Sequence, residues 1–381
     1  MKKIFLVALL IISTCFWAAA AKNDVEVDFR VFSGAKFVDN LKITDIQVLQ
    51  DGKPQTIDAL YQVKGREIVN MEGLKKKPKT KRLFIFVFCM RRYSVRIDEA
   101  LDYFFNRVIA SGDALTFLTP ENVYNMRGPA LRQKKPQEIA HQLKGLLRRD
   151  VKQGNHSYLK RLEQLKEVVT DLSQGGAIQD FGIGLMKYAD SLESVDRIRI
   201  KEQAKIIQFL MQQRKQKEKK FAFVFYERET KPDFTNRDMQ KYMEQFNNRT
   251  DILPKLQGLF ELYRREVAFN LKEVGEKFAA SGLLVNFVNF KTPFLTAERG
   301  VTMNEYSEDA MALFSQFAQA TGGIVEHSAN PGFFFKKAEA FSNCFYSLRY
   351  VPSVPEKKKK FRKLEIKIKN KKYKITHCTG Y

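Results

Sequence analysis

The chain has 381 residues, enough for one large domain or two smaller ones, each with its own hydrophobic core. Hydrophobic residues make up 44% of the chain and charged residues 29%, a globular composition that excludes a disordered chain and a repetitive fibre. The net charge of +23 is strongly basic, and no motif in the chain identifies a reaction.

The start of the chain has the pattern of a secretory signal peptide. Residues 2–3 are lysines, residues 4–17 are mostly apolar, and residues 18–21 are alanines that suit a cleavage site before Lys22. We therefore expect the protein to be exported, to the periplasm or out of the cell, with residues 1–21 removed.

Two other interpretations of this first segment stay open. Cys15 could carry a lipid anchor, although the threonine before it fits that pattern poorly, or the segment could remain as an uncleaved anchor. No later window reaches 18 apolar residues, so no transmembrane segment is expected after cleavage.

Residues 22–80 are predicted to form a β segment followed by a basic linker. Residues 25–32 alternate apolar and polar side chains for most of their length, and residues 43–49 do so more loosely. Residues 51–53 (Asp-Gly-Lys) are typical of a hairpin turn. The lysine-rich residues 75–82 are the linker.

The next segment is predicted to be a β-α-β unit with a right-handed crossover. Residues 83–88 are continuously apolar, as in a strand covered on both faces, and residues 97–108 have one apolar helical face. Residues 114–118 form the second strand. Residues 135–220 are mostly helical and charged, which favours an inserted helical hairpin on the surface over a partner-binding coiled coil, because the heptad is not sustained.

Strands and helices alternate again after the insertion. Apolar residues 221–226 and 283–290 are predicted strands, and helices lie between and after them. This alternation predicts an α/β core over residues 81–340, with a doubly wound, mostly parallel sheet. Residues 341–381 return to a basic β pattern and are expected to pack with residues 22–80 as a flanking β module, because each is too small to bury a sheet face alone.

Both ends of the chain resemble one known family. The opening reads GAKFVDNL at residues 34–41 and ITDIQVLQDGKPQ at residues 43–55. The close reads YSLRYVP at residues 346–352 and FRKLEI at residues 361–366, and it ends in Gly-Tyr. These stretches resemble the bacterial secreted VWFA-related (von Willebrand factor type A-related) domain family. The resemblance implies an A-type core with flanking β elements, and it implies no known catalysis.

The resemblance also implies a metal-dependent adhesion site, built from an Asp-x-Ser-x-Ser run after the first core strand, with oxygen ligands that suit Mg²⁺. In this chain Cys89 stands at the Asp position, and Arg91 and Tyr93 stand at the Ser positions. This degenerate loop offers no carboxylate and its arginines repel a cation, so we expect neither metal nor cofactor. We expect Glu227 or Glu229, which follow another core strand at the same sheet edge, to pair with these arginines.

The cysteines leave several interpretations. Cys89 beside arginines could be a nucleophile, but the four histidines are scattered without a catalytic motif, so no enzyme activity is expected. In an oxidising compartment Cys344 and Cys378 are the candidate disulfide, and three reduced buried thiols are the alternative. A metal site of these two cysteines with His377 is disfavoured, because no second Cys/His pair has ligand spacing.

Positive charge is concentrated near the C-terminus. Residues 349–374 contain twelve Lys or Arg and two acidic residues, and Lys367, Lys369, Lys372 and Lys374 alternate with apolar residues. This pattern predicts either a surface for polyanions, such as acidic envelope polymers or lipid headgroups, or an ordinary solvated face. Nucleic acid is not expected, because aromatic residues do not interleave with these lysines.

These observations favour a secreted, non-enzymatic protein-interaction or scaffold protein that works without a metal and whose partner is another protein. A polyanion-binding envelope protein that uses the lysine-rich hairpin is the alternative. An enzyme is the third class, and Cys89 would have to carry it.

Overall fold

The computed structural model of the protein describes residues 24–73, 81–174, 178–261, 267–290, 300–327, 330–353, 361–369 and 372–381. The predicted signal peptide, residues 1–21, and most of the predicted linker, residues 75–82, lie outside the described residues.

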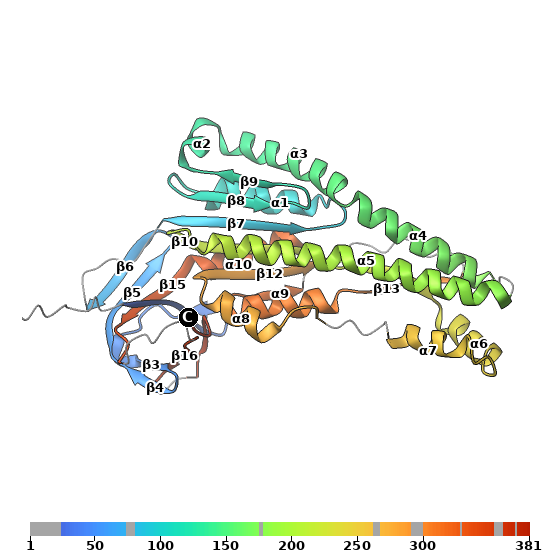
Figure 1. Ribbon diagram of the computed structural model, residues 1–381. Coiled ribbons are helices and arrows are strands. Elements are labelled where there is room, and N and C mark those ends of the chain that lie inside the picture. The colour runs from blue at the N-terminus through green and yellow to red at the C-terminus, as the bar shows by residue number, and fades with distance from the viewer. Residues whose placement is uncertain are drawn as a thin grey trace, which may run out of the picture.

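A six-stranded mixed sheet, here called the central sheet, lies in the middle of the molecule (Figure 1). Its strand order is β14-β12-β10-β7-β8-β9, in which β9 pairs antiparallel with β8 and the other pairings are parallel. The strands are β7 (Arg82–Cys89), β8 (Ala114–Leu118), β9 (Val123–Met126), β10 (Lys219–Glu227), β12 (Leu283–Phe290) and β14 (Val325–His327). The apolar runs predicted as strands form β7, β10 and β12, each buried along nearly its whole length.

Two apolar clusters cover the two faces of the central sheet. Alternate strand positions point to opposite faces, so Phe84 and Phe86 of β7 belong to one cluster and Ile85 and Val87 to the other. The helices of the first face are α1 (Arg96–Tyr103) with its π-helical extension Phe104–Val108, α3 (Pro136–Gly154) and α10 (Pro331–Asn343). The helices of the second face are α5 (Ile178–Gln213), α8 (Leu271–Ala279) and α9 (Glu308–Thr321).

The two ends of the chain form two further sheets beside the central one. One, the terminal sheet, has the order β17-β1-β15-β5-β6 with β2 on β1, and the other has the order β16-β3-β4. The terminal sheet contains β1 (Val25–Ser33), β2 (Lys36–Phe37), β5 (Ile57–Lys64), β6 (Glu67–Gly73), β15 (Cys344–Tyr350) and β17 (Lys374–His377). The other contains β3 (Ile46–Gln50), β4 (Lys53–Gln55) and β16 (Leu364–Ile368), and the 3₁₀ turn Ile43–Asp45 precedes it.

The prediction that the N-terminal and C-terminal β segments pack together is confirmed. β1 pairs antiparallel with both β15 and β17, and β3 pairs with β16. Lys219, the first residue of β10, joins the terminal sheet to the central one, because its ammonium lies 2.7 Å from carboxylate oxygens of Glu26 and Asp28 on β1.

A helical arm extends from one end of the central sheet (Figure 1). α4 (His156–Ser173) runs beside the first half of α5, and near the far end lie α6 (Asn236–Gln245) and α7 (Leu253–Glu261). The ribbon of β11 (Thr230–Phe234) and β13 (Val301–Glu305) packs against α4, while the short α2 (Gly128–Gln133) lies before α3. The arm has an apolar cluster of its own, which includes Leu165, Tyr188 and Phe246. No helix among the described residues, the 36-residue α5 included, is long and apolar enough to cross a membrane.

The predicted fold class, a doubly wound and mostly parallel sheet, is wrong. The described residues form four sheets, and nine of their thirteen strand pairings are antiparallel, so the protein is a mixed α/β fold with several antiparallel sheets. Alternating strands and helices predicted parallel neighbours, but β9 folds back on β8 without a crossover helix. The strands of the chain ends likewise pair antiparallel, and they form two sheets rather than a single flanking module.

Candidate functional site

A small cavity lies at the carboxyl ends of β7 and β10, between the central sheet and α5. Its volume is about 50 Å³, and its wall includes Cys89, Arg91, Arg199, Gln203 and Glu229. From β7 the chain continues to β8 on one side, and β10 is the neighbour of β7 on the other side. The connections after β7 and β10 therefore run in opposite directions along the sheet. Ligands of α/β sheets bind at the carboxyl ends of two such strands. A functional site is therefore expected at this position.

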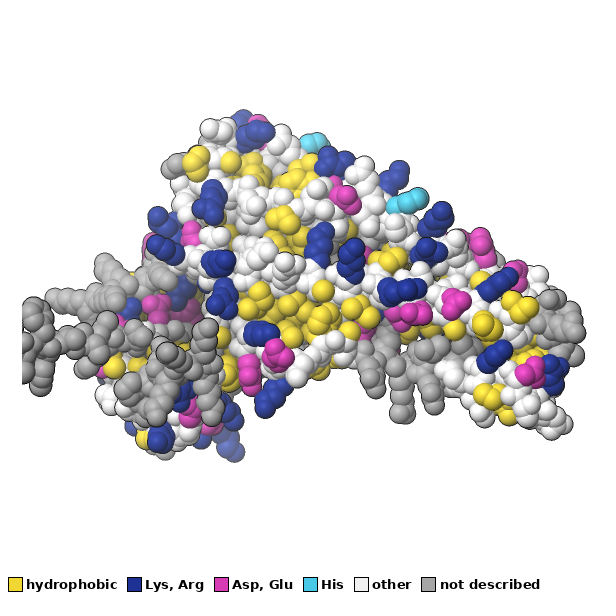
Figure 2. Space-filling view, viewed as in Figure 1, with side chains coloured by type: hydrophobic (Ala, Val, Ile, Leu, Met, Phe, Trp, Pro, Cys, Tyr) yellow, Lys and Arg dark blue, Asp and Glu magenta, His cyan; other side chains and the backbone are white. Residues whose placement is uncertain are grey.

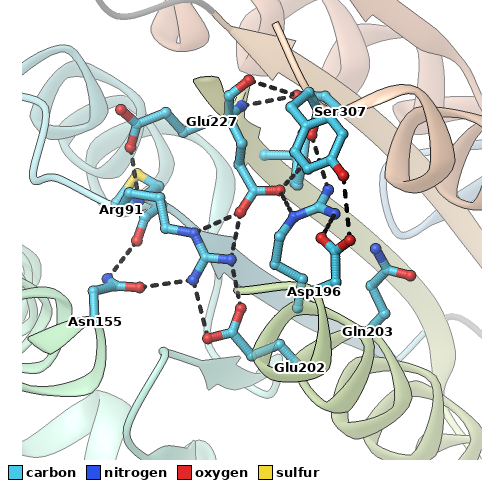
Figure 3. A network of polar contacts seen from close by, with 12 residues as sticks. Arg91, Asn155, Asp196, Glu202, Gln203, Glu227 and Ser307 are labelled. Atoms are coloured by element: carbon cyan, nitrogen blue, oxygen red, sulfur yellow. Dashed lines mark hydrogen bonds and ion pairs between the residues drawn. The ribbon is translucent and has the colours of Figure 1, made fainter. Parts of the chain in front are cut away.

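Arg91 occupies this position with its own side chain (Figure 3). Its Nε donates to Glu229 Oε1 at 2.7 Å and its Nη1 to Asn155 Oδ1 at 3.0 Å, and its Nη2 lies 2.7 Å from Glu202 Oε2. The guanidinium also stacks over the ring of Tyr158, 3.7 Å from the ring centre. Three polar partners and the face of an aromatic ring thus hold the guanidinium of Arg91 at the end of β7.

The predicted pairing of the loop arginines with Glu227 or Glu229 is confirmed for the side chain of Arg91. Glu229 binds the Arg91 guanidinium, and Glu227 accepts hydrogen bonds from the backbone N–H groups of Arg91 and Arg92 at 2.7 and 2.9 Å. Tyr93, the last residue of the loop, points elsewhere and donates to Asp98. Arg91 and Tyr93 are therefore held by carboxylates from the protein itself.

Arg199 of α5 is the second cation of the site, and the sequence analysis missed it. Its side chain is only 2% exposed; its Nε donates to Glu229, and its Nη2 donates to Asp309 Oδ1 at 2.9 Å (Figure 3). Arg199 continues the buried stripe of α5 that runs through Leu192 and Val195. A charged residue inside an apolar helical stripe is the signal that could have identified it.

The two arginines set the ionisation of the site. Burial alone would raise the pKa of Glu229, but Arg199 and Arg91 outweigh it and lower that pKa below its usual range. Burial, with the nearby Glu202, raises the pKa of Cys89 far above its usual value, because one arginine cannot offset both. Cys89 therefore stays a neutral thiol, which is a poor nucleophile.

The site offers little room or chemistry for a reaction. The cavity, at about 50 Å³, has space for a few water molecules. In the part of the chain that the structure describes, no group of three His, Cys, Asp or Glu side chains is arranged to hold a metal ion. The carboxylates that could bind a cation or move a proton are bound to Arg91 and Arg199 instead.

Asp196, at the edge of this network, makes stability depend on pH. Burial, against the attraction of Arg199, raises the pKa of Asp196 to about 6, whereas an unfolded Asp has a pKa near 3.9. The folded state therefore holds this proton more tightly, and Asp196 costs stability increasingly as the pH rises from about 4 to about 6.

We expect Asp196→Asn to be more stable than the wild type at pH 7, by about 1–2 kcal/mol after allowance for partial exposure of the side chain. The difference should vanish below about pH 4, and urea unfolding at a series of pH values measures it. Asp190→Asn, at an exposed position of the same helix, is the control and should show no such trend. A difference that does not change with pH would contradict this assignment.

The predicted disulfide between Cys344 and Cys378 is wrong. β1 lies between β15, which begins at Cys344, and β17, which ends one residue before Cys378, and both thiols are free. Burial raises the pKa of both, that of Cys378 to about 11. The ring of His377 contacts backbone atoms of Ile366 and Cys378, so the disfavoured metal site is not assembled either.

The four lysines of the predicted polyanion surface are exposed. Leu364, Ile366 and Ile368 face the core and Lys367 and Lys369 face solvent, and Lys372 and Lys374 lie before and at the start of β17. Glu365 pairs with Lys367 at 3.1 Å. The predicted hairpin itself is wrong, because β16 and β17 lie in different sheets, where they pair with β3 and β1. Figure 2 shows that Lys and Arg side chains are also spread over the face that carries α3 and α5, so the positive charge is not confined to these four lysines.

Comparisons of the chain with protein-family models, with curated proteins and with solved structures find no match.

Proposed function

We propose that this protein is an exported, non-enzymatic protein-interaction or scaffold protein that works without a metal ion. The observation that supports this most is the occupied position at the carboxyl ends of β7 and β10. Where a substrate or cation would bind, Arg91 and Arg199 clamp Glu229 from both sides, and the neighbouring thiol of Cys89 is held neutral. Because its own ion pairs fill this site, we infer that the core acts as a rigid support and that partners bind at other surfaces of the protein.

The same contacts support the proposal of metal independence. A divalent cation at this loop would have to displace a guanidinium from Glu229 and then lie beside Cys89 and Arg91, which supply no oxygen ligand. The proposed likeness to the VWFA-related family agrees with this role, with a guanidinium in place of the family's cation. We also propose export, which N-terminal sequencing of the protein from its native host tests: a chain starting at Lys22 is expected, and one starting at Met1 would contradict it.

Adding Mg²⁺, Mn²⁺ or Ca²⁺ to the chelator-treated protein should change its Tm by less than about 1 °C, because a ligand raises Tm only if it binds the folded state. Differential scanning fluorimetry measures this, and Glu229→Gln is the matched variant. A rise of several degrees that disappears in Glu229→Gln would mean that the ion network is a metal site after all.

Affinity capture from the native host tests the interaction function itself. The mature chain and its Cys89→Ser variant are used at about 0.15 M and about 0.5 M salt, since salt screens exposed charges. The proposal expects the same stoichiometric protein partner in all four experiments. Loss of the partner with Cys89→Ser would indicate cysteine chemistry.

Polyanion binding is the second candidate, and the exposed Lys367, Lys369, Lys372 and Lys374 favour it. If it is correct, the captured material is an acidic polymer or lipid, binding is lost at the higher salt, and replacing the four lysines by glutamine abolishes it.

A further inference from the structure

Val95 and Phe333 are the most exposed large hydrophobic side chains among the residues that the structure describes, at 69% and 63%. Val95 directly precedes α1, which follows β7, and Phe333 lies in the first turn of α10, which follows β14. Both helices therefore start at the edge of the central sheet where the parallel strands end.

The two side chains lie at neighbouring helix ends. A Cβ added to Gly332 would be 3.0 Å from the Cβ of Glu99, and farther along the rings of Phe335 and Tyr103 are 6.1 Å apart. The two helices thus run side by side in the same direction, and Val95 and Phe333 both occupy their starting ends. α1 and α10 contribute to the apolar cluster on one face of the central sheet, whereas α5 contributes to the cluster on the other face.

Folding does not explain either residue. Val95, just before α1, has helical backbone angles, φ −60° and ψ −20°, and its side chain makes no cap hydrogen bond. Phe333 is the only member of its three-phenylalanine run that faces solvent, since Phe334 and Phe335 are fully buried. An exposed valine and an exposed phenylalanine at the starts of two neighbouring helices point to a binding surface.

The charges around this pair are mainly basic. Arg92 and Arg96 flank Val95, and Lys336 and Lys337 lie one turn along α10 from Phe333; all four side chains are exposed. The nearby acids are Glu99, which is exposed, Asp98, which pairs with Arg148, and Glu326, which pairs with Lys337. A second copy of the chain would bring the same basic residues together across a two-fold axis, where they would repel.

We propose that Val95 and Phe333, with Arg92, Arg96 and Lys336 around them, form a docking surface for an acidic segment of a partner protein that carries an apolar anchor residue. This surface, here called the rim patch, rests on the proposed interaction function and specifies where the partner binds. The apolar side chain of the partner packs on Phe333 and Val95, and its carboxylates lie against the guanidinium and ammonium groups. An anionic membrane is a weaker match, because two apolar side chains bury too little for stable anchoring.

The test uses fluorescein-labelled peptides of Asp and Glu with one central Phe, and the same peptides with a central Ser, in fluorescence anisotropy with the mature chain. We expect the Phe peptides to bind more tightly, and Phe333→Ser or Val95→Ser to weaken only their binding, by about tenfold. Arg92→Ser should weaken both peptides and reduce the salt dependence. Ile183→Ser is the matched control, because Ile183 is 55% exposed on the arm, and it should change nothing.

Three results would overturn the rim patch. The first is equal binding of the Phe and Ser peptides, and the second is no effect of Phe333→Ser. The third is that the protein binds vesicles of phosphatidylglycerol and phosphatidylcholine in a Phe333-dependent way and does not bind the peptides. Affinity capture with Phe333→Ser separates this failure from that of the proposed function. If the variant still captures the partner of the wild-type chain, the interaction function stands and the rim patch is not its surface. Because Phe333 and Val95 are exposed, their variants should keep the wild-type Tm, so lost binding reports the surface rather than unfolding.

Discussion

Replacing Arg199 by alanine is expected to lower the free energy of unfolding by about 3–5 kcal/mol, because it leaves Glu229 and Asp309 buried with one cation fewer. Both carboxylates are nearly inaccessible to water, so solvent cannot replace the lost partner. Urea unfolding followed by circular dichroism measures the change.

The same helix supplies the control for this substitution. The Arg197 side chain is 70% exposed and lies 3.9 Å from the exposed Glu193, so Arg197→Ala should change stability by less than about 0.5 kcal/mol. A double variant, Arg199→Met with Glu229→Gln, should recover part of the loss, because it removes a buried charge together with its partner. If Arg199→Ala cost no more than Arg197→Ala, the ion network would contribute little to folding.

Phe335→Ala is expected to have a comparable effect, about 3–5 kcal/mol, for a different reason. Phe335 is fully buried, and its ring lies within 6.0 Å, centre to centre, of the rings of Phe86, Phe104 and Phe223. Its removal leaves a cavity where α10 meets the central sheet.

Phe333→Ala is the matched control, two residues away in the same helix. Its side chain is 63% exposed, so the change should alter the free energy of unfolding by less than about 0.5 kcal/mol. Thermal unfolding of the two variants side by side checks both. A large effect of Phe333→Ala would mean that this ring packs in the folded protein, and it would contradict the rim patch as well.

Individual strands of this protein can be predicted from its sequence far better than their neighbours can. The apolar runs of β7, β10 and β12 identify strands covered on both faces, because few other structures bury six consecutive side chains. Periodicity reports which side of a strand is buried and says nothing about which strand lies beside it. For that reason the sequence does not predict the hairpin of β8 with β9, or the position of β1 between β15 and β17.

In the candidate site, too, some contacts can be predicted from the sequence and others cannot. The contact of Arg91 with Glu229 could be predicted because both residues follow apolar strands whose ends meet at one sheet edge. Arg199 approaches that edge from a helix more than 100 residues along the chain from Arg91, and only tertiary packing places it there. The neutral state of Cys89 also depends on burial. The neighbouring arginines in the sequence suggest a lowered pKa for the thiol, but burial raises that pKa by more than Arg91 lowers it.

The position of β1 has a consequence for the order in which the chain folds. β1 pairs along one side with β15 and along the other with β17, so Phe29 lies opposite both Tyr346 and His377. More than 300 residues separate these partners, and pairings of such long range form slowly. The terminal sheet cannot be completed until β15 and β17 have been made, and until then β1 pairs only with the two-residue β2 among the described strands. The terminal sheet is therefore expected to close after the central sheet, once residues far from β1 in the sequence have been made.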